Sequence, residues 1–282
     1  MNDHEKYKNI LIKPHQLKSN DPDSQLNNIP VPPNVNNFAV ISPCFYKEQV
    51  EMETYSKKTF KEEEIKYITY GDGEEFTNKV YTNLLRLHTL LNEIEDEYDE
   101  VLIMDAKDAL YLGGETLLTL ITKWRNINGK KPTVILASEK ECYPKGSDIF
   151  YNEKQERYLN SGLIMGETTL IKVMIGEMIQ KYDLQRFELD NGSLNHSQIY
   201  WHRYFNEGKL KENIHIDYNH EFFYCMDSCD PSIELELINE RKIRVKKTNT
   251  YPKIFHFNRC LIDEYKYLFG EFWVESLQRR GR

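Results

Sequence analysis

The chain has 282 residues, of which 40% are hydrophobic and 12% aromatic, enough to bury one large core or two small ones. Its formal net charge of −8 at pH 7 opposes binding to nucleic acid by phosphate neutralisation, so a nucleic-acid partner is disfavoured. No run reaches the roughly 18 apolar residues of a membrane helix, and the first residues, MNDHEKYKNI, lack the apolar stretch of a secretion signal. We therefore expect a soluble protein without a membrane partner, in the cytoplasm or within a compartment of a host cell.

The cysteines show no framework of paired spacings. Their number is odd, so we expect mostly free thiols in a reducing compartment. A disulfide between Cys225 and Cys229 is the alternative that the spacing leaves open. The full set is Cys44, Cys142, Cys225, Cys229 and Cys260.

The sequence predicts one domain behind a lead-in. Residues 14–37 are polar, contain several prolines and show no hydrophobic period, so residues 1–37 are expected to form a mobile polar segment. The folded domain is expected to span residues 38–282.

The first half of this domain has the pattern of alternating strands and helices. Buried strands are predicted at 38–42 (FAVIS), 65–70 (IKYITY) and 101–104 (VLIM), with a GDG turn at 71–73. An amphipathic helix is predicted to begin near Phe76, because apolar residues recur from there at steps of three and four. These residues are Val80, Leu84, Leu87, Leu91 and Ile94.

A further strand, TVILA at 133–137, is flanked by two predicted helices. The first helix is marked by Leu117, Leu120, Ile121 and Trp124, and the second by Leu170, Met174, Met178 and Tyr182. This alternation predicts an α/β fold with a largely parallel sheet covered on both faces. After residue 212 a series of short strands predicts an added antiparallel layer. They are IHI at 214–216, FFY at 222–224, IELEL at 233–237, KIRV at 242–245 and KIFHF at 253–257.

Two carboxylates, Asp105 and Asp108, follow directly after the buried strand at 101–104. In an open α/β sheet, ligands bind beyond the carboxyl ends of the strands, so these side chains are expected at a binding edge. Hard oxygen ligands of this kind suit Mg²⁺ or Mn²⁺, which in turn can bridge a diphosphate. The alternative is a chance D-x-x-D at a strand end.

Five segments within roughly residues 38–270 are informative when they are taken together: YDEVLIMDAKDALYLGG, PTVILASEKECYP, ERYLNSGLIMG, NHSQIYW and KIFHFN. In this order they resemble the glycosyltransferase domain of the collagen lysyl hydroxylases. The resemblance implies a GT-A-type, Rossmann-like nucleotide-binding sandwich that uses an acidic motif to hold Mn²⁺ and a UDP-sugar donor. Because only EFWVESLQRRGR follows residue 270, we do not expect the hydroxylase half of those enzymes in this chain.

By this resemblance, Asp105 and Asp108 match the family's metal-binding acids, and His256 matches the histidine that completes the metal shell. A neutral imidazole beside two carboxylates is compatible with Mn²⁺. Without the resemblance, His256 would be interpreted as a packed histidine in a strand. Asn258 lies on the same strand face if the strand continues, and there it could donate to a phosphate oxygen.

Three more positions are expected on the donor side. Ser42 stands where the family contacts the uridine, and Lys79 matches a lysine that could neutralise diphosphate charge, an exposed helix lysine being the alternative. Lys107 stands where the family commonly has an aromatic residue that stacks on the base. The uridine preference therefore depends on the other matches.

The acceptor side is expected to include Glu139 as an acid of the cleft and Tyr143 as its aromatic residue. The alternatives are a solvated loop acid and a surface ring. The segment YLNSG resembles the family's substrate-lining loop, in which a glycine permits close approach of the backbone. It supplies Asn160, Ser161 and Gly162.

The acidic run of the family is altered in this chain. The family has aspartates before a glutamine, whereas ELDNGSLNHSQ keeps Gln198 but has His196 and Ser197 in their place. Asp190 is the nearest carboxylate, and with Glu139 it is the candidate catalytic group. The resemblance implies a retaining reaction; we favour front-face displacement assisted by the departing phosphate over a covalent route through Asp190.

The leading functional hypothesis is transfer of glucose from UDP-glucose to galactosyl-hydroxylysine of a collagen-like protein. The alternatives are transfer of galactose from UDP-galactose to hydroxylysine, glycosylation of a glycan or a modified nucleic-acid base, and a catalytically silent sugar-binding domain. The sequence leaves the oligomeric state open, a homo-oligomer included.

Overall fold

The computed structural model describes eight stretches of the chain, which contain most of the elements expected from the sequence. The expected helix at 117–124, Asp72 and Gly73 of the GDG turn, Lys79, Asp190 and His196 lie outside them, as does the lead-in except for Asn37. The described residues are 37–44, 51–71, 80–113, 133–145, 147–151, 157–182, 197–239 and 241–258.

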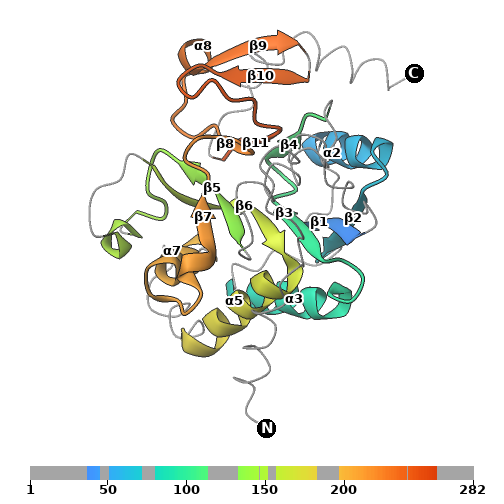
Figure 1. Cartoon of the computed structure of the whole chain (residues 1–282), viewed down its shortest axis with the longest axis vertical. Helices are drawn as coiled ribbons and strands as arrows, with labels where there is room; N and C mark the ends of the chain where they lie inside the picture. Colours follow the sequence, from blue (N-terminus) through green and yellow to red (C-terminus); the bar gives the residue numbers. More distant parts are fainter. Residues whose placement is uncertain are drawn as a thin grey trace, which may run out of the picture.

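The core of the fold is a six-stranded sheet with the order β2-β1-β3-β6-β5-β7 (Figure 1). β1 runs parallel to both β2 and β3, and β5 runs parallel to β7. The strands are β1 (Phe38–Pro43), β2 (Lys66–Tyr70), β3 (Glu100–Met104), β5 (Val134–Glu139), β6 (Tyr158–Glu167) and β7 (Ile214–Ile216).

The expectation of a largely parallel sheet is wrong at β6, which runs antiparallel to both of its neighbours, β3 and β5. The link from β5 to β6 is 18 residues long and contains the short 3-10 helix η3 (Ser147–Phe150) in its described part. An antiparallel neighbour needs no crossover helix, whereas a parallel one does. The segment YLNSG, expected as a loop, is the beginning of this strand.

The two faces of the sheet carry different layers because alternate residues of each strand point to opposite sides. Ala39 and Ile41 of β1 pack with helices α3 (Val80–Ile94), α5 (Thr168–Lys181) and α7 (Ser197–Glu207). α3 and α5 lie side by side on this face (Figure 1). Val40 faces the other way and packs with α2 (Glu51–Glu62) and a second sheet.

The second sheet has the order β4-β11-β8 and supplies one side of the candidate site. It consists of β4 (Ala109–Tyr111), β11 (Ile254–His256) and β8 (Phe223–Cys225). β11 runs antiparallel to β4 but parallel to β8, so the predicted antiparallel layer is only partly right. The segment predicted as strand IHI instead forms β7, at the edge of the main sheet.

An antiparallel hairpin of β9 (Leu235–Asn239) and β10 (Lys242–Val245) follows the short helix α8 (Pro231–Glu234) (Figure 1). The sequence predicted a strand from residue 233, but helix α8 occupies the first two of these positions. Another short 3-10 helix, η4 (Lys211–Asn213), precedes β7. Within the described stretches, no helix has the length and apolar character needed to cross a membrane. Cys225 and Cys229 are not joined by a disulfide, in agreement with the expectation of mostly free thiols.

Candidate functional site

The two sheets meet at the acidic turn between β3 and β4. β3 belongs to the large sheet and ends at Met104, and β4 begins the small sheet at Ala109. β11 pairs with β4 so that His256 lies opposite Ala109, and the N–H of Phe257 donates to the carbonyl of Asp108 at 2.7 Å. Backbone pairing therefore brings the histidine to the acidic turn from a distant part of the sequence.

The structure brings Asp105, Asp108 and His256 together, and a metal ion held by them stays a prediction. The Nε2 atom of His256 lies 3.5 Å from Asp105 Oδ2 and 3.4 Å from Asp108 Oδ1. One ligand atom from each residue lies within 4.8 Å of the others. Both acids are partly open to solvent, whereas the histidine side chain is only 4% exposed.

The charge balance of this cluster favours a cation. Burial disfavours a charged His256 ring, but Asp108 and Asp105 outweigh it and raise the pKa of His256 well above its ordinary value. Burial likewise opposes the ionised form of Asp108, yet His256 and then Lys107 lower the pKa of this carboxyl. The same two carboxylates that favour a proton on the ring would also favour a divalent cation in place of that proton.

The residues present fit a divalent metal ion in three respects. Two carboxylate oxygens and one imidazole nitrogen form a donor set that suits Mn²⁺. His256 Nε2 is buried and makes no hydrogen bond of good geometry, although both acids lie beside it. Gly162 leaves the space open: a Cβ atom there would lie 2.2 Å from His256 Cε1 and 2.8 Å from Asp105 Oδ2.

Glu139 is placed differently from either expectation for it. It is fully buried at the end of β5, and is neither a solvated loop acid nor an acid exposed in a cleft. Its Oε2 accepts hydrogen bonds from Asn160 Nδ2 at 3.0 Å and Asn258 Nδ2 at 2.6 Å, and its Oε1 accepts from Gln198 Nε2 at 2.5 Å. This carboxylate holds together side chains from separate elements, as a satisfied buried polar network does.

Helix α7 anchors the segment that carries Tyr143. The carbonyl oxygen of Tyr143 accepts from Gln198 Nε2 at 2.7 Å and lies 2.9 Å from His202 Nε2. These two residues are four positions apart and so share one face of the helix. Gln198 also accepts from the N–H of Ser161 on β6 at 3.1 Å, through its Oε1. The expected acceptor-side residues Tyr143, Ser161 and Gln198 are therefore joined by hydrogen bonds.

Two expected donor-side residues have their side chains engaged inside the protein. The hydroxyl of Ser42 is buried and donates to the carbonyl of Met104 at 2.7 Å, which ties β1 to β3. The amide of Asn258 donates to Glu139, where a phosphate contact was expected. Lys107 is exposed in the turn between Asp105 and Asp108.

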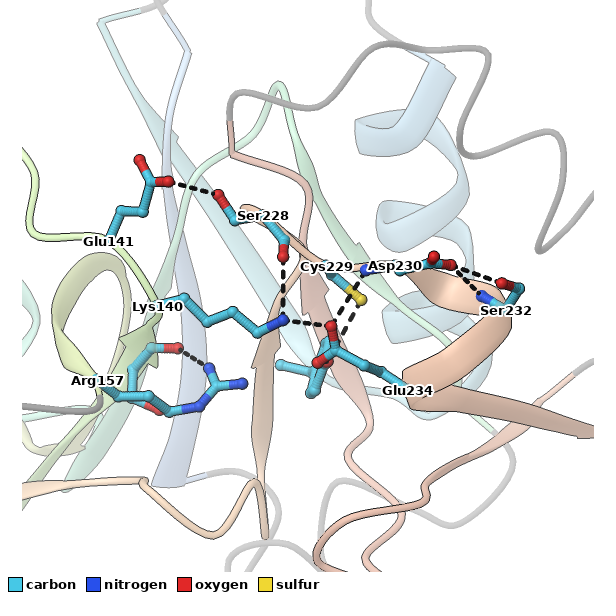
Figure 2. A network of polar contacts seen from close by, with 10 residues as sticks. Lys140, Glu141, Arg157, Ser228, Cys229, Asp230, Ser232 and Glu234 are labelled. Carbon is cyan, nitrogen blue, oxygen red and sulfur yellow. Dashed lines mark hydrogen bonds and ion pairs between the residues drawn. The ribbon is translucent and has the colours of Figure 1, made fainter.

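A further polar network ties the end of β5 to the α8–β9 segment (Figure 2). Lys140 pairs with Glu234 and donates to the carbonyl of Ser228 at 3.0 Å, while the Ser228 hydroxyl donates to Glu141 at 3.0 Å. The ring of Tyr224 on β8 lies beneath Arg157, and its hydroxyl donates to Glu234 at 2.9 Å. Sequence reasoning missed this network because its members lie far apart along the chain.

Sequence reasoning also missed Cys225, whose sulfur lies 3.9 Å from His256 Nδ1. The contact arises because β8 and β11 pair in parallel with Cys225 opposite His256. Neither residue carries a local signal of this pairing, and a three-residue strand is too short for a hydrophobic period to specify its partner.

Comparison with known proteins gives a family match and a structural match. Residues 49–272 match the family model described as "PLOD GT domain". The fold is similar to that of the crystal structure of a glycosyltransferase involved in the glycosylation of the major capsid of PBCV-1, with a TM-score of 0.51 and 7% sequence identity, over 82% of this chain and 98% of that chain. A comparison with curated proteins gives no match. Because the family model covers most of the sequence, the chain belongs to the PLOD GT domain family, the glycosyltransferase domains of the lysyl hydroxylases.

Proposed function

We propose that this glycosyltransferase is metal-dependent and retaining, and moves glucose from UDP-glucose to galactosyl-hydroxylysine of a collagen-like protein. The observation that carries the proposal is the convergence of Asp105, Asp108 and His256 at the edge of a nucleotide-binding type of sheet, in a chain of this family. UDP-galactose and hydroxylysine are the closest alternative donor and acceptor.

In this proposal the three side chains hold Mn²⁺, and Gly162 keeps the space beside them free. The metal ion would supply positive charge that offsets the charge developing on the leaving diphosphate. Lys107, exposed beside both acids, adds a positive charge that suits a phosphate contact. Ser42 and Asn258 support the donor side from within the protein, and Lys79 remains a proposed diphosphate contact.

The proposed reaction is a front-face displacement. The acceptor hydroxyl oxygen bonds to the anomeric carbon on the face from which the diphosphate leaves, and the bond between that carbon and the diphosphate oxygen breaks. Its electron pair stays with the phosphate, and the hydroxyl proton passes to a departing phosphate oxygen. The configuration at the anomeric carbon is thereby retained. Asp190 is proposed to stabilise the positive charge that develops on the sugar.

The acceptor is proposed to lie along the segment of Tyr143 and the start of α7. An aromatic face suits the apolar side of a sugar ring, and Tyr143 is held there through its own carbonyl by Gln198 and His202. Glu139, Asn160, Ser161 and Gly162 are proposed to support this side of the site.

Measurement of nucleoside diphosphate release tests the proposal. Wild-type protein is given UDP-glucose, UDP-galactose or GDP-glucose, with and without Mn²⁺, and a galactosyl-hydroxylysine peptide, a hydroxylysine peptide or a free glycan. We expect metal-dependent release that is fastest with UDP-glucose and the galactosylated peptide. Asp105→Asn should abolish it, while Asp96→Asn, an exposed acid after α3, should not. Equal release by Asp105→Asn and wild type would refute the metal site, and a preference for the glycan would refute the acceptor.

A further inference from the structure

Asn160 lies behind the metal-site histidine, away from solvent. It is 2% exposed, on strand β6, and its amide group connects His256 with Glu139. Its Oδ1 accepts from the N–H of Gly162 at 2.9 Å and lies 2.9 Å from His256 Nδ1. Its Nδ2 donates to Glu139 Oε2 at 3.0 Å.

These contacts determine which way the amide faces. The main-chain N–H of Gly162 can only donate, so the atom that it meets must be the amide oxygen. The opposite end of the amide meets a carboxylate oxygen of Glu139, which accepts from the NH₂ group. An amide oxygen cannot donate, so the 2.9 Å contact with His256 requires a proton on Nδ1.

A proton fixed on Nδ1 directs Nε2 toward the acids. Nε2 is the atom that lies 3.5 Å from Asp105 and 3.4 Å from Asp108. In neutral imidazole only one ring nitrogen carries a proton, so the bond to Asn160 leaves the lone pair on Nε2. Metal-binding histidines commonly donate their other ring nitrogen to such a partner, which fixes both tautomer and ring orientation.

We infer that Asn160 is a positioning residue that presents His256 Nε2 to the cation, and that Glu139 sets the orientation of Asn160. This inference builds on the proposed metal-dependent function. Glu139 is itself held by Asn258 and Gln198, so the arrangement continues to the first turn of α7. In the described part of the chain, the other polar side-chain atom near Nδ1 is the sulfur of Cys225 at 3.9 Å, a weak acceptor.

Calorimetric titration with Mn²⁺ alone tests the inference without any turnover. Asn160→Ala should weaken Mn²⁺ binding by about 10–100-fold, the usual effect of removing the partner of a metal-bound histidine. The matched control is Asn92→Ala, which removes another asparagine–histidine contact, between the exposed Asn92 and the half-buried His88 on α3. The control should bind Mn²⁺ like the wild type.

A charge exchange separates positioning from a loss of packing. The double variant Asn160→Asp with Glu139→Gln keeps an oxygen toward His256 Nδ1 and exchanges the donor and acceptor between positions 139 and 160. The Asn258 amide, which meets the same atom of residue 139, then turns so that its oxygen accepts from the new NH₂ group. With total charge unchanged, it should recover Mn²⁺ affinity relative to Asn160→Ala. No recovery in a folded double variant, judged by the circular dichroism of the metal-free protein, would show that packing accounts for the loss and would overturn the inference.

The wild type supplies a test that does not depend on the folding of any variant. In the Mg²⁺-loaded protein, ¹⁵N-edited NMR of the His256 ring should show the proton on Nδ1 and none on Nε2. A proton on Nε2 in the loaded state would overturn the inference. If the wild type and Asn160→Ala bind Mn²⁺ equally while Asp105→Ala does not bind it, the positioning role of Asn160 is refuted and the proposed metal site stands. If the wild type does not bind Mn²⁺, the proposed function fails first and the inference with it.

Discussion

Gly162→Ala is expected to damage both stability and metal binding, because the site has no room for a methyl group. The added Cβ would lie 2.2 Å from His256 Cε1, 2.8 Å from His256 Nδ1 and 2.8 Å from Asp105 Oδ2. Asp105 is partly exposed and can move, but His256 is buried in β11 and bonded to Asn160. The relief of the clash must therefore displace a proposed metal ligand.

The magnitude follows from the cost of overpacking a buried position, about 1–3 kcal/mol. For a chain of this size that corresponds to a fall in Tm of about 2–12 °C for the metal-free protein. A second effect should appear with Mn²⁺: the wild type should gain about 2.7 kcal/mol at a free Mn²⁺ concentration of about 100 times Kd, and the variant should gain much less.

Thermal unfolding with and without Mn²⁺ measures both effects, and Gly176→Ala on α5 is the matched control. A Cβ at position 176 would meet only the end of the His88 side chain, with the nearest atom 3.1 Å away. Alanine is favoured over glycine in a helix by about 1 kcal/mol, so this variant should keep its stability and its response to Mn²⁺. Unchanged Tm and an unchanged response to Mn²⁺ in Gly162→Ala would refute the close-packed geometry proposed for the site.

Three further outcomes are expected for Glu139, for Asp217 and for the pair between Lys140 and Glu234. Glu139→Ala removes the acceptor of three buried side-chain amides and should lower the free energy of unfolding, measured by urea titration, by about 3 kcal/mol. A loss below about 1 kcal/mol would show that the hydrogen bonds to Glu139 contribute little to stability. Burial raises the pKa of Asp217 to about 6, although three main-chain N–H groups favour its ionised form. Between about pH 4 and pH 6 the folded protein therefore binds a proton on Asp217 that the unfolded chain has lost, and the free energy of unfolding should fall as the pH rises through this range. Asp217→Asn should lose this pH dependence. A variant whose stability varies with pH as that of the wild type does would contradict the role of Asp217. Lys140→Ala breaks the partly exposed pair with Glu234 and should cost about 1 kcal/mol; no change in Tm would show that the pair contributes nothing.

The elements that could be predicted from sequence are those with a local hydrophobic signal. β1, β3 and β5 are apolar runs, and α3 and α5 bury one regular apolar face. Helix α2 was missed because it buries polar groups as well: Ser56 donates to the carbonyl of Ala109 and accepts from the N–H of Tyr111 on β4. Hydrophobic periodicity does not detect a helix face of this kind.

The residues of the candidate site likewise differ in whether a local pattern in the sequence identifies them. Asp105 and Asp108 could be found locally, because they follow a buried strand, whereas His256 was identified only through the family resemblance. The role inferred for Asn160 depends on the reversed direction of β6, which brings Gly162 beside Asp105 through the bond from the N–H of Asp105 to the Gly162 carbonyl. Strand direction is a property of the assembled sheet, and no local pattern of residues in YLNSG encodes it.

Asp105, Asp108 and His256 are proposed to hold the metal ion of this glycosyltransferase. Crystals grown with Mn²⁺ and UDP, measured at the manganese absorption edge, test it most directly. We expect an anomalous peak within bonding distance of one carboxylate oxygen from each acid and of His256 Nε2. A manganese peak elsewhere with this cluster unoccupied, or coordination through His256 Nδ1, would contradict it.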